Sequence, residues 1–351
     1  MDNSVNTIFD NELSAEEKKI LQHVIERYDL KVSNFAKVRS AYKVETDKGT
    51  MCIKKIKHGK HKVDNGDLLV KRLRDNNFRN TAKYIYTKDG HSYVNISKYF
   101  FYVTEWIKGH ECDLSDISEV ENCSRLLAEF HLATNKIDTS KLAIKNNLKN
   151  WPKLFGSILN DLEKYKRIIH RKKLKSEFDI MYLSYIDSYY SRGLYLLNML
   201  NKSDYHKLSI EASKNKTICH DSFYYQNIIK MEDKYYIIDL DSIMIDLQIN
   251  DLGKFIRRLM HKSEYQWDFE KALLIIKAYA SINKLTKSEY EAMIALILFP
   301  HKFWKLGKKR YTKNKGWNES KYIDKLTKIT KYNEPEQKFL NEYTDYINNT
   351  L

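Results

Sequence analysis

The chain begins with a helical spacing of apolar residues. They return every three or four positions up to about Tyr28, which is the spacing of one face of a helix. Ser14 and Glu17 stand three positions apart at the start of this run, and such a pair can form a capping box. We therefore predict a helix from Ser14 to about Tyr28.

The following segments show the alternation of apolar and polar positions that is typical of strands. The turn-forming segments Asp-Lys-Gly and Lys-Asp-Gly interrupt this alternation, and each predicts a β-hairpin. The predicted elements are hairpins at 42–54 and 84–96, a short helix at 66–75 and a strand at 99–104. This part of the chain is expected to form a small antiparallel sheet.

The spacing changes after Gly109. Apolar residues repeat at helical intervals over 116–133 and 150–208, and the chain reads as helical from Asp251 to its end. A short apolar hairpin at 228–238 interrupts these helices.

This order of elements predicts an α+β, bilobal, protein-kinase-like fold. The predicted parts are an N-terminal β-rich lobe at 1–109, with a hinge at 105–109, and a large, mainly helical lobe at 110–351. In that plan a nucleotide binds in the cleft, and the helical lobe supplies metal and acceptor groups.

The composition is that of an ordered globular protein. The chain has 351 residues, 42% of them hydrophobic, with only three prolines and ten glycines. No stretch approaches about 18 uncharged apolar residues, so a membrane-spanning helix is not expected. The start of the chain, Met1–Ser4, has no signal-peptide character, and the four cysteines form no CxxC pair. We therefore expect cytoplasmic synthesis with reduced thiols.

The net charge is +15, from 61 Lys and Arg against 46 Asp and Glu. A basic surface attracts nucleic acid, anionic lipid or acidic proteins, but the lysines are spread along the chain, as a simple compositional bias would also produce. The densest basic run, 302–315, also contains aromatic residues, which could stack on bases. No nucleic-acid-binding motif accompanies it, so nucleic acid is not expected as a partner.

Two oxygen-bearing side chains near the short apolar hairpin are candidate metal ligands. Asn227 ends a polar loop, and Asp239 follows the apolar run Tyr235–Ile238. An ATP kinase needs two such groups to hold Mg²⁺ on the phosphates. An ordinary turn would also use an Asn and an Asp.

The loop before Asn227 carries the candidate catalytic residues. His220 would hold the loop by hydrogen bonds. A general base is expected two positions after the His and five before the Asn, and that slot is Ser222. Asp221 is one position early. A serine cannot accept a proton at neutral pH, and a group misplaced by about 1 Å can lose about 100-fold in rate.

Lys54, at the end of the predicted strand Cys52–Lys54, is the candidate lysine for the nucleotide phosphates. It shares a strand face with Cys52, opposite Ile53, although any strand lysine can also be a solvated charge. Such a lysine usually pairs with a Glu on the next helix, but no Glu occurs between residues 58 and 80. Asp67 is a weak substitute.

Two further segments bear on nucleotide binding. Glu105 and Ile107 would offer backbone groups to adenine, although the segment also fits a plain linker between a strand and a helix. The turn at 37–41 contains no glycine, so its amides cannot approach phosphates as closely as a glycine-rich loop allows.

With these residues assembled, the chain resembles the CotS family of endospore coat proteins. That family belongs with the aminoglycoside-phosphotransferase and choline-kinase-like superfamily. The superfamily's His-x-Asp segment with an Asn five positions later is similar to His220, Ser222 and Asn227. Its magnesium aspartate resembles Asp239, and its helix-start aspartate resembles Asp251.

Other matching segments extend the resemblance over nearly the whole chain. The helix at 126–131 resembles the superfamily's Leu-Ala-x-x-His helix. Three C-terminal segments resemble the CotS group more specifically. They are Phe299-Pro300-His301-Lys302-Phe303-Trp304, 310–311 and 315–317. Read without the family, the Pro300 segment is a broken helix with packed aromatic residues.

The resemblance implies a spore coat-associated protein with a kinase-like fold. Ser222 in the base slot favours a pseudokinase that is catalytically weak or inactive. The alternative is an active kinase that uses ATP and Mg²⁺ to phosphorylate a small-molecule or protein hydroxyl. The implied partners are other spore coat proteins and a small-molecule acceptor, without a membrane, and the implied location is the spore coat.

Overall fold

The computed structural model describes residues 13–57, 59–135, 137–146, 148 and 150–350. Met1–Ser4, on which the expectation about a signal peptide rests, lies outside the described residues. The chain divides into two compact units: one holds the residues up to Cys112 with 136–145 and 222–243, and the other holds 113–135, 146–221 and 244–351. The lobe ranges and the hinge at 105–109 stay predictions.

The main sheet of the first unit contains six strands among the described residues, all in antiparallel pairs. The hairpin predicted at 42–54 is confirmed. The hairpin predicted at 84–96 is wrong, because both of its strands pair with β6 and not with each other. The strands are β1 (Val32–Val38), β2 (Ala41–Thr46), β3 (Gly49–Lys57), β6 (Tyr99–Glu105) and β4 (Tyr84–Ile85) in sheet order, with β5 (Val94–Ile96) also on β6.

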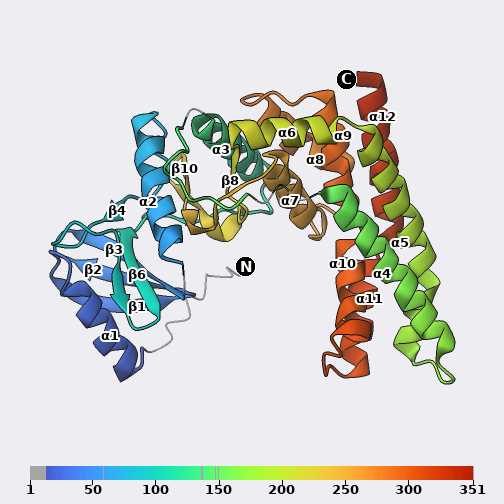
Figure 1. Ribbon diagram of the computed structural model, residues 1–351, viewed down its shortest axis with the longest axis horizontal. Helices are drawn as coiled ribbons and strands as arrows, with labels where there is room; N and C mark the ends of the chain where they lie inside the picture. Colours follow the sequence, from blue (N-terminus) through green and yellow to red (C-terminus); the bar gives the residue numbers. More distant parts are fainter. Residues whose placement is uncertain (1–12, 58, 136, 147, 149, 351) are drawn as a thin grey trace, which may run out of the picture. The chain divides into compact units, whose positions relative to one another are not determined.

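Helix α1 (Ala15–Ile25) covers one face of this sheet (Figure 1). The predicted capping box is present, because the Ser14 hydroxyl accepts from the Glu17 amide and the Glu17 carboxylate accepts from the Ser14 amide. The core between helix and sheet includes Leu21, Val24, Tyr42, Val44, Ile53 and Val103. The strand residues in this core alternate with residues that face away from α1, and Lys54 is one of those.

Helix α2 (Lys60–Asp75) begins earlier than predicted and packs against the short helical turn η2 (Leu240–Ser242). Gly66 permits this approach. A Cβ atom added there would lie 3.2 Å from the Leu240 carbonyl oxygen and would overlap the Tyr84 hydroxyl. Since η2 directly follows Asp239, the close packing at Gly66 fixes the position of that turn.

A second, three-stranded sheet completes the first unit. The predicted hairpin at 228–238 is confirmed as β9 (Ile228–Met231) and β10 (Lys234–Ile237), and β7 (His110–Glu111) pairs with β9. The amide of Ile237 also donates to the Asn80 carbonyl, at 2.8 Å. The hairpin that ends before Asp239 is therefore tied to the segment between α2 and β4.

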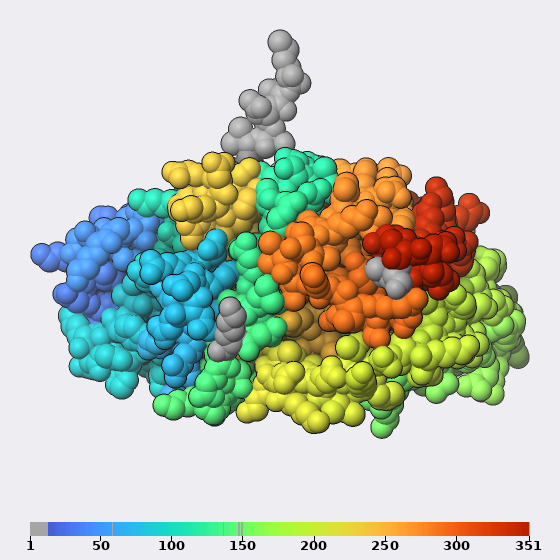
Figure 2. All heavy atoms as spheres, turned by 90° about the horizontal axis from the view of Figure 1, so that it is seen from above, coloured from blue at the N-terminus to red at the C-terminus, as the bar shows by residue number. Residues whose placement is uncertain are grey.

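The second unit is mainly helical, as predicted. Its helices pack in pairs, of which α3 with α8, α4 with α5 and α7 with α9 are the most extensive. Figure 2 shows α12, in red, lying on the orange segment that contains α8 and α9. The helices are α3 (Ile117–Thr134), α4 (Trp151–Arg171), α5 (Glu177–Lys202), α6 (Tyr205–Asn215), α7 (Ile249–Met260), α8 (Phe269–Ala280), α9 (Lys287–Leu298), α10 (His301–Gly307), α11 (Glu319–Thr330) and α12 (Asn333–Thr350).

The break at Pro300 and its aromatic packing are confirmed. Pro300 separates α9 from α10, and Phe299 and Phe303 are buried. The ring of Phe303 stacks on Tyr182 at 4.1 Å and on Tyr189 at 4.2 Å between centroids. A π-helical turn, η3 (Lys308–Thr312), follows α10, and the short strands β8 (Ile218–Cys219) and β11 (Met244–Ile245) pair with each other. The described helices include none long and apolar enough to cross a membrane.

Candidate functional site

Lys54 and Asp239 form an ion pair in the first unit. Lys54 lies on the face of β3 turned away from α1, where the alternation with Ile53 places it, and its side chain is 18% exposed. Asp239 follows β10 and adopts a left-handed backbone, with φ of 70°. A non-glycine residue in that region is uncommon and is found most often among Asn and Asp. The turn therefore presents the Asp239 carboxylate to the strand lysine.

Asn227 is hydrogen-bonded to the residue that precedes Asp239. Its carbonyl accepts from the amide of Ile238 at 3.0 Å, directly before Asp239. Its side-chain Nδ2 donates to the Ser222 carbonyl at 3.0 Å, which fixes the orientation of the carboxamide. The structure thus brings Lys54, Asn227 and Asp239 together, while their roles with phosphate and metal stay predictions.

Asp241 joins this group and was not among the residues singled out from the sequence. Its carboxylate accepts from the Ser242 hydroxyl at 3.1 Å and lies 3.5 Å from the Tyr102 hydroxyl. Burial and then the charge of Asp239 raise the pKa of Asp241 to about 6. In the sequence, only its position two residues after Asp239 marks Asp241 as a candidate. Its burial could not be predicted, because it depends on Tyr102, which is far away along the chain.

The donor set of this turn fits a hard divalent cation. Asn227 supplies a carboxamide oxygen, and Asp239 and Asp241 supply carboxylates, which are ligands of the kind Mg²⁺ prefers. Two carboxylates near one lysine leave surplus negative charge, which adds to the effect of burial in raising the pKa of Asp241. A bound cation would relieve it.

Asp67 on α2, the weak candidate for the acidic partner of Lys54, is bound by other residues. Asp67 is buried, accepts from the Lys71 ammonium at 3.0 Å and bonds the Tyr86 hydroxyl. Lys54 therefore has Asp239 as its acidic partner, and Asp67 serves to join α2 to Tyr86.

The turn between β1 and β2 has only two residues, Arg39 and Ser40, between the paired Val38 and Ala41. Arg39 adopts the left-handed region with φ of 55°. Its guanidinium lies 2.8 Å from the Glu111 carboxylate and 5.7 Å from the centre of the Tyr225 ring. The glycine-free turn is thus held by a side chain, a role that the sequence did not reveal.

The candidate adenine segment is partly engaged within the protein. The amide of Glu105 donates to the Lys83 carbonyl at 2.9 Å, and that of Trp106 donates to the Thr50 carbonyl at 3.2 Å. The Glu105 carboxylate accepts from the Lys83 amide at 3.1 Å. Among the hydrogen bonds of the described residues, the Ile107 amide donates none, so it remains a candidate donor for adenine.

In the second unit, Asp251 holds the start of the candidate catalytic loop. One carboxylate oxygen accepts from the His220 amide at 2.6 Å and the other from the Asp221 amide at 2.9 Å. These two bonds hold the loop amides in place. Asp251 is not the N-cap of α7, because the residue before that helix is Gln248 and Asp251 lies within its first turn.

His131 completes this buried arrangement. Its Nε2 lies 3.2 Å from the Asp251 carboxylate and its Nδ1 lies 2.7 Å from the Tyr279 hydroxyl. Burial alone would raise the pKa of Asp251, but the hydrogen bonds from His131 and the loop hold it below its ordinary value. The signal in the sequence was the helix at 126–131, which ends on this histidine.

Cys219 lies close enough to His131 and Asp251 for the three to share a metal ion by distance. Each has a protein partner instead, since the Cys219 thiol donates to the Leu247 carbonyl at 3.3 Å. Burial raises the pKa of Cys219 well above its ordinary value, and a thiolate is the form that binds metal. His131 and Asp251 are therefore bonded to each other, and Cys219 is bonded to the backbone beside them.

Asp221, the carboxylate nearest to the base slot, is engaged by a lysine. Its Oδ1 lies 2.6 Å from the Lys254 ammonium on α7, and its backbone is left-handed, with φ of 64°. Ser222 follows it directly and accepts the bond from Asn227. Lys254 was not identified from the sequence, because it stands 33 positions after Asp221 and only the folded chain brings them together.

Comparisons with known proteins extend over nearly the whole chain. A family model described as "Spore coat putative kinase YutH" matches residues 21–343. Spore coat protein S of Bacillus subtilis (strain 168) is 25% identical over 258 residues, which cover 73% of this chain and 73% of that protein. The expected resemblance to spore coat proteins is confirmed.

Solved structures show the same fold. An aminoglycoside phosphotransferase from Alicyclobacillus acidocaldarius subsp. acidocaldarius DSM 446 matches with a TM-score of 0.84 and 21% identity, over 93% of this chain and 96% of that chain. The amicoumacin kinase hAmiN, in complex with AMP-PNP, Ca²⁺ and Ami, matches with a TM-score of 0.61 and 13% identity, over 92% and 94%. At such identities the likeness concerns the fold, and the predicted kinase-like fold is confirmed.

Proposed function

Because the chain belongs to the YutH family of spore coat proteins, we propose that it binds Mg-ATP and transfers phosphate weakly or not at all. It acts in the spore coat, where other coat proteins are its partners. The family and the Bacillus subtilis relative, which are both described as spore coat proteins, support this location.

The proposal rests on the loop at residues 220–222, which has no carboxylate in the position of the general base. The base slot holds Ser222, and the preceding carboxylate, Asp221, is ion-paired with Lys254 at 2.6 Å. A general base must reach the acceptor hydroxyl and accept its proton. Ser222 cannot accept one at neutral pH, and Asp221 would have to leave both its lysine and its left-handed backbone.

The phosphate-binding group supports nucleotide binding in spite of the loop. Lys54 would neutralise phosphate oxygens, while Asn227 and Asp239 would hold the metal, with Asp241 beside them. Bound Mg²⁺ would supply positive charge that offsets the charge of the phosphates. The Ile107 amide would donate to adenine, and the carbonyl of Glu105 would accept from it.

The alternative is an active kinase that phosphorylates a small-molecule or protein hydroxyl. The joining of Lys54, Asn227 and Asp239 favours it, because phosphoryl transfer depends mainly on positioning and electrostatics. A missing base would then reduce the rate without abolishing it.

Four proteins test the proposal: the wild type, Lys54→Met, Asp239→Asn and Ser222→Asp. Thermal unfolding with millimolar Mg-ATP should show a stabilisation of the wild type that both Lys54→Met and Asp239→Asn lose. Phosphate release and transfer from labelled ATP to a spore coat extract should stay near background for the wild type. The Ser222→Asp variant, with a carboxylate in the base slot, should be at least about 10-fold faster, since a general base contributes about 10²–10⁴-fold.

This experiment distinguishes a weak or inactive Mg-ATP-binding protein from an active kinase. Wild-type transfer well above background that disappears in Asp239→Asn would establish the active kinase instead. If Mg-ATP leaves the unfolding temperature of the wild type unchanged, nucleotide binding itself is disproved.

A further inference from the structure

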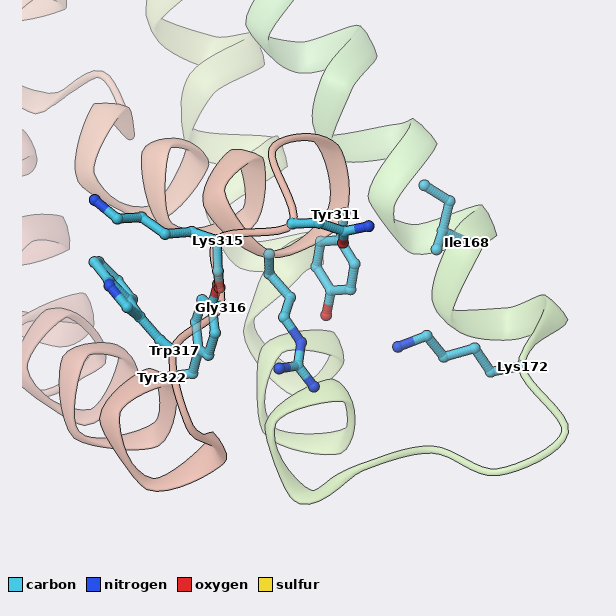
Figure 3. Close-up of a pocket in the computed structure, with 9 residues that line it drawn as sticks. Ile168, Lys172, Tyr311, Lys315, Gly316, Trp317 and Tyr322 are labelled. Atoms are coloured by element: carbon cyan, nitrogen blue, oxygen red, sulfur yellow. The ribbon is translucent and has the colours of Figure 1, made fainter.

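A cavity of about 430 Å³ lies in the second unit, and none of the residues that line it is among those discussed for the nucleotide. The end of α4, the π-helical turn η3, the following segment and α11 surround it. Figure 3 shows Trp317 and Tyr322 along one side and Ile168 and Lys172 along the other, with the Lys172 ammonium directed inward. The volume is within the range of about 300–1,000 Å³ that is common for small-molecule sites.

The lining of this cavity is basic and aromatic. Lys172, Arg310 and Lys315 contribute cations, and none of the nine described residues that line it is acidic. Two of these cations have acidic partners outside the lining. Lys172 lies 2.7 Å from the Asp179 carboxylate, and Arg310 lies 2.7 Å from that of Glu319. Lys315 has no such partner among the ion pairs of the described residues.

Trp317 gathers further positive charge at the edge of the cavity. Its ring centre lies 5.0–5.2 Å from the ammonium groups of four lysines, Lys309, Lys315, Lys321 and Lys325. Over the part of the chain that the structure describes, no ion pair contains any of the four. Of these four lysines, Lys315 lines the cavity, and the other three lie around Trp317, which is itself a lining residue.

These four charges repel one another. Nitrogen atoms that each lie within 5.2 Å of one point are at most about 10 Å apart, which is close to the screening length of about 8 Å in physiological salt. The attraction of each ammonium for the indole face offsets part of this repulsion. An anion bound among them would remove it, so the arrangement favours a multivalent anion.

We propose that the cavity between α4, η3 and α11 binds a small molecule that carries two or more phosphate groups. A phosphate monoester bears about −1.5 to −2 at neutral pH, so two such groups match four unpaired lysines. Carboxylates, at one charge each, would need four groups in the same volume. The guanidinium of Arg310 suits paired phosphate oxygens, and the rings of Tyr311 and Tyr322 line the cavity beside it.

Pyrophosphate and tripolyphosphate are the probes for this site, in magnesium-free buffer at a fixed salt concentration. Binding is followed by tryptophan fluorescence, because Trp317 is one of only five tryptophans. The Trp317→Phe variant identifies the local part of the signal, and calorimetry gives the affinity independently of it. Citrate, an Asp/Glu-rich peptide and single-stranded RNA are offered as competitors.

The informative variant is Lys309→Gln with Lys315→Gln, and its matched control is Lys284→Gln with Lys287→Gln. The control lysines are exposed, belong to the same unit and do not line the cavity. We expect pyrophosphate to bind at least about 10-fold more weakly to the first double variant. The control and Lys54→Met should stay within about twofold of the wild type. If the double variant does not fold, Lys315→Gln alone is used, because this side chain is exposed and its ammonium lies over the Trp317 ring.

Three results would overturn the proposal. The first is that neither phosphate probe binds the wild type. The second is an affinity that the Lys309 and Lys315 substitutions leave unchanged or that Lys54→Met abolishes, which would assign binding to another place. The third is binding of the acidic peptide or the RNA at least about 10-fold more tightly than tripolyphosphate, which would identify a macromolecular surface instead.

Discussion

At the scale of single residues, Asp251 holds the backbone of the loop at residues 220–221 in the second unit. Its two oxygens accept from the amides of His220 and Asp221, and His131 bonds the first of them. The carboxylate is almost completely buried, so its charge is balanced only by these donors. Removing a partner or a charge from such a buried set is costly.

We predict that Asp251→Asn lowers the free energy of unfolding by about 3 kcal/mol at neutral pH, because Asn offers one acceptor oxygen to two backbone donors and its NH₂ group would face the other donor. The pKa of Asp251 is lowered in the folded state. Its stabilisation is therefore present above the ordinary value of about 4 and is lost as the pH falls through the folded-state pKa. The difference between wild type and variant should shrink below about pH 4.

Denaturant unfolding across this pH range measures the effect. Asp345→Asn, at an exposed position of the same unit, is the matched control and should change stability by less than about 0.5 kcal/mol. Equal stability of the wild type and Asp251→Asn at neutral pH would contradict the role assigned to Asp251.

At the scale of elements, the packing of α2 on η2 determines where the candidate metal-binding turn lies. Gly66 is the point of closest approach, with the Leu240 carbonyl and the Tyr84 hydroxyl directly over it. An added side chain would overlap the Tyr84 hydroxyl and press on the Leu240 carbonyl of the turn that carries Asp241. Structural stability and the proposed nucleotide binding are therefore expected to depend on the same contact.

We predict that Gly66→Ala costs about 1–3 kcal/mol, as overpacking typically does, and reduces the stabilisation by Mg-ATP. Gly156→Ala is the matched control, because nothing lies within 4 Å of the added atom in α4. That change should leave stability equal or raise it by up to about 1 kcal/mol. Thermal unfolding with and without Mg-ATP measures both. If the two variants behave alike, the proposed close contact at Gly66 has no effect.

The element scale also shows what the sequence could predict. Helix α1, the first hairpin, the break at Pro300 and the hairpin before Asp239 followed from local spacing and turn residues. The partners of β4 and β5 did not, because alternation identifies a strand without identifying its neighbour.

The candidate site, like the fold, could be predicted from the sequence only in part. Lys54, Asn227 and Asp239 each stand beside a recognisable strand or turn, and the fold brings them together. Lys254 and Arg39 could not be found in this way. Their contacts join residues 33 and 72 positions away, and nothing local to either lysine or arginine marks them.

At the scale of the whole molecule, the first unit is built from three separate stretches of chain. The hairpin at 228–237 and the turn with Asp239 belong to it, and they hydrogen-bond to Asn80 and Cys112 of the N-terminal stretch. A domain that ended at Cys112 would lack all three candidate metal ligands, Asn227, Asp239 and Asp241.

We predict that the fragment 1–112 does not form a stable domain and does not bind Mg-ATP, whereas the full chain does. The fragment lacks Asn227 and Asp239 and leaves Lys54 without its acidic partner. Circular dichroism during heating and calorimetry with Mg-ATP measure the two properties. A cooperative transition together with nucleotide binding in the fragment would show that the later stretches are dispensable.

The left-handed backbone of Asp221 and Asp239 affects how mutational scans of this family should be interpreted. An alanine at either position removes the carboxylate and also penalises the local backbone, since alanine has little tolerance for positive φ. Loss of function in an alanine variant would therefore mix a chemical effect with a conformational one. Asparagine and glycine, which both accept this conformation, separate the two contributions when compared side by side.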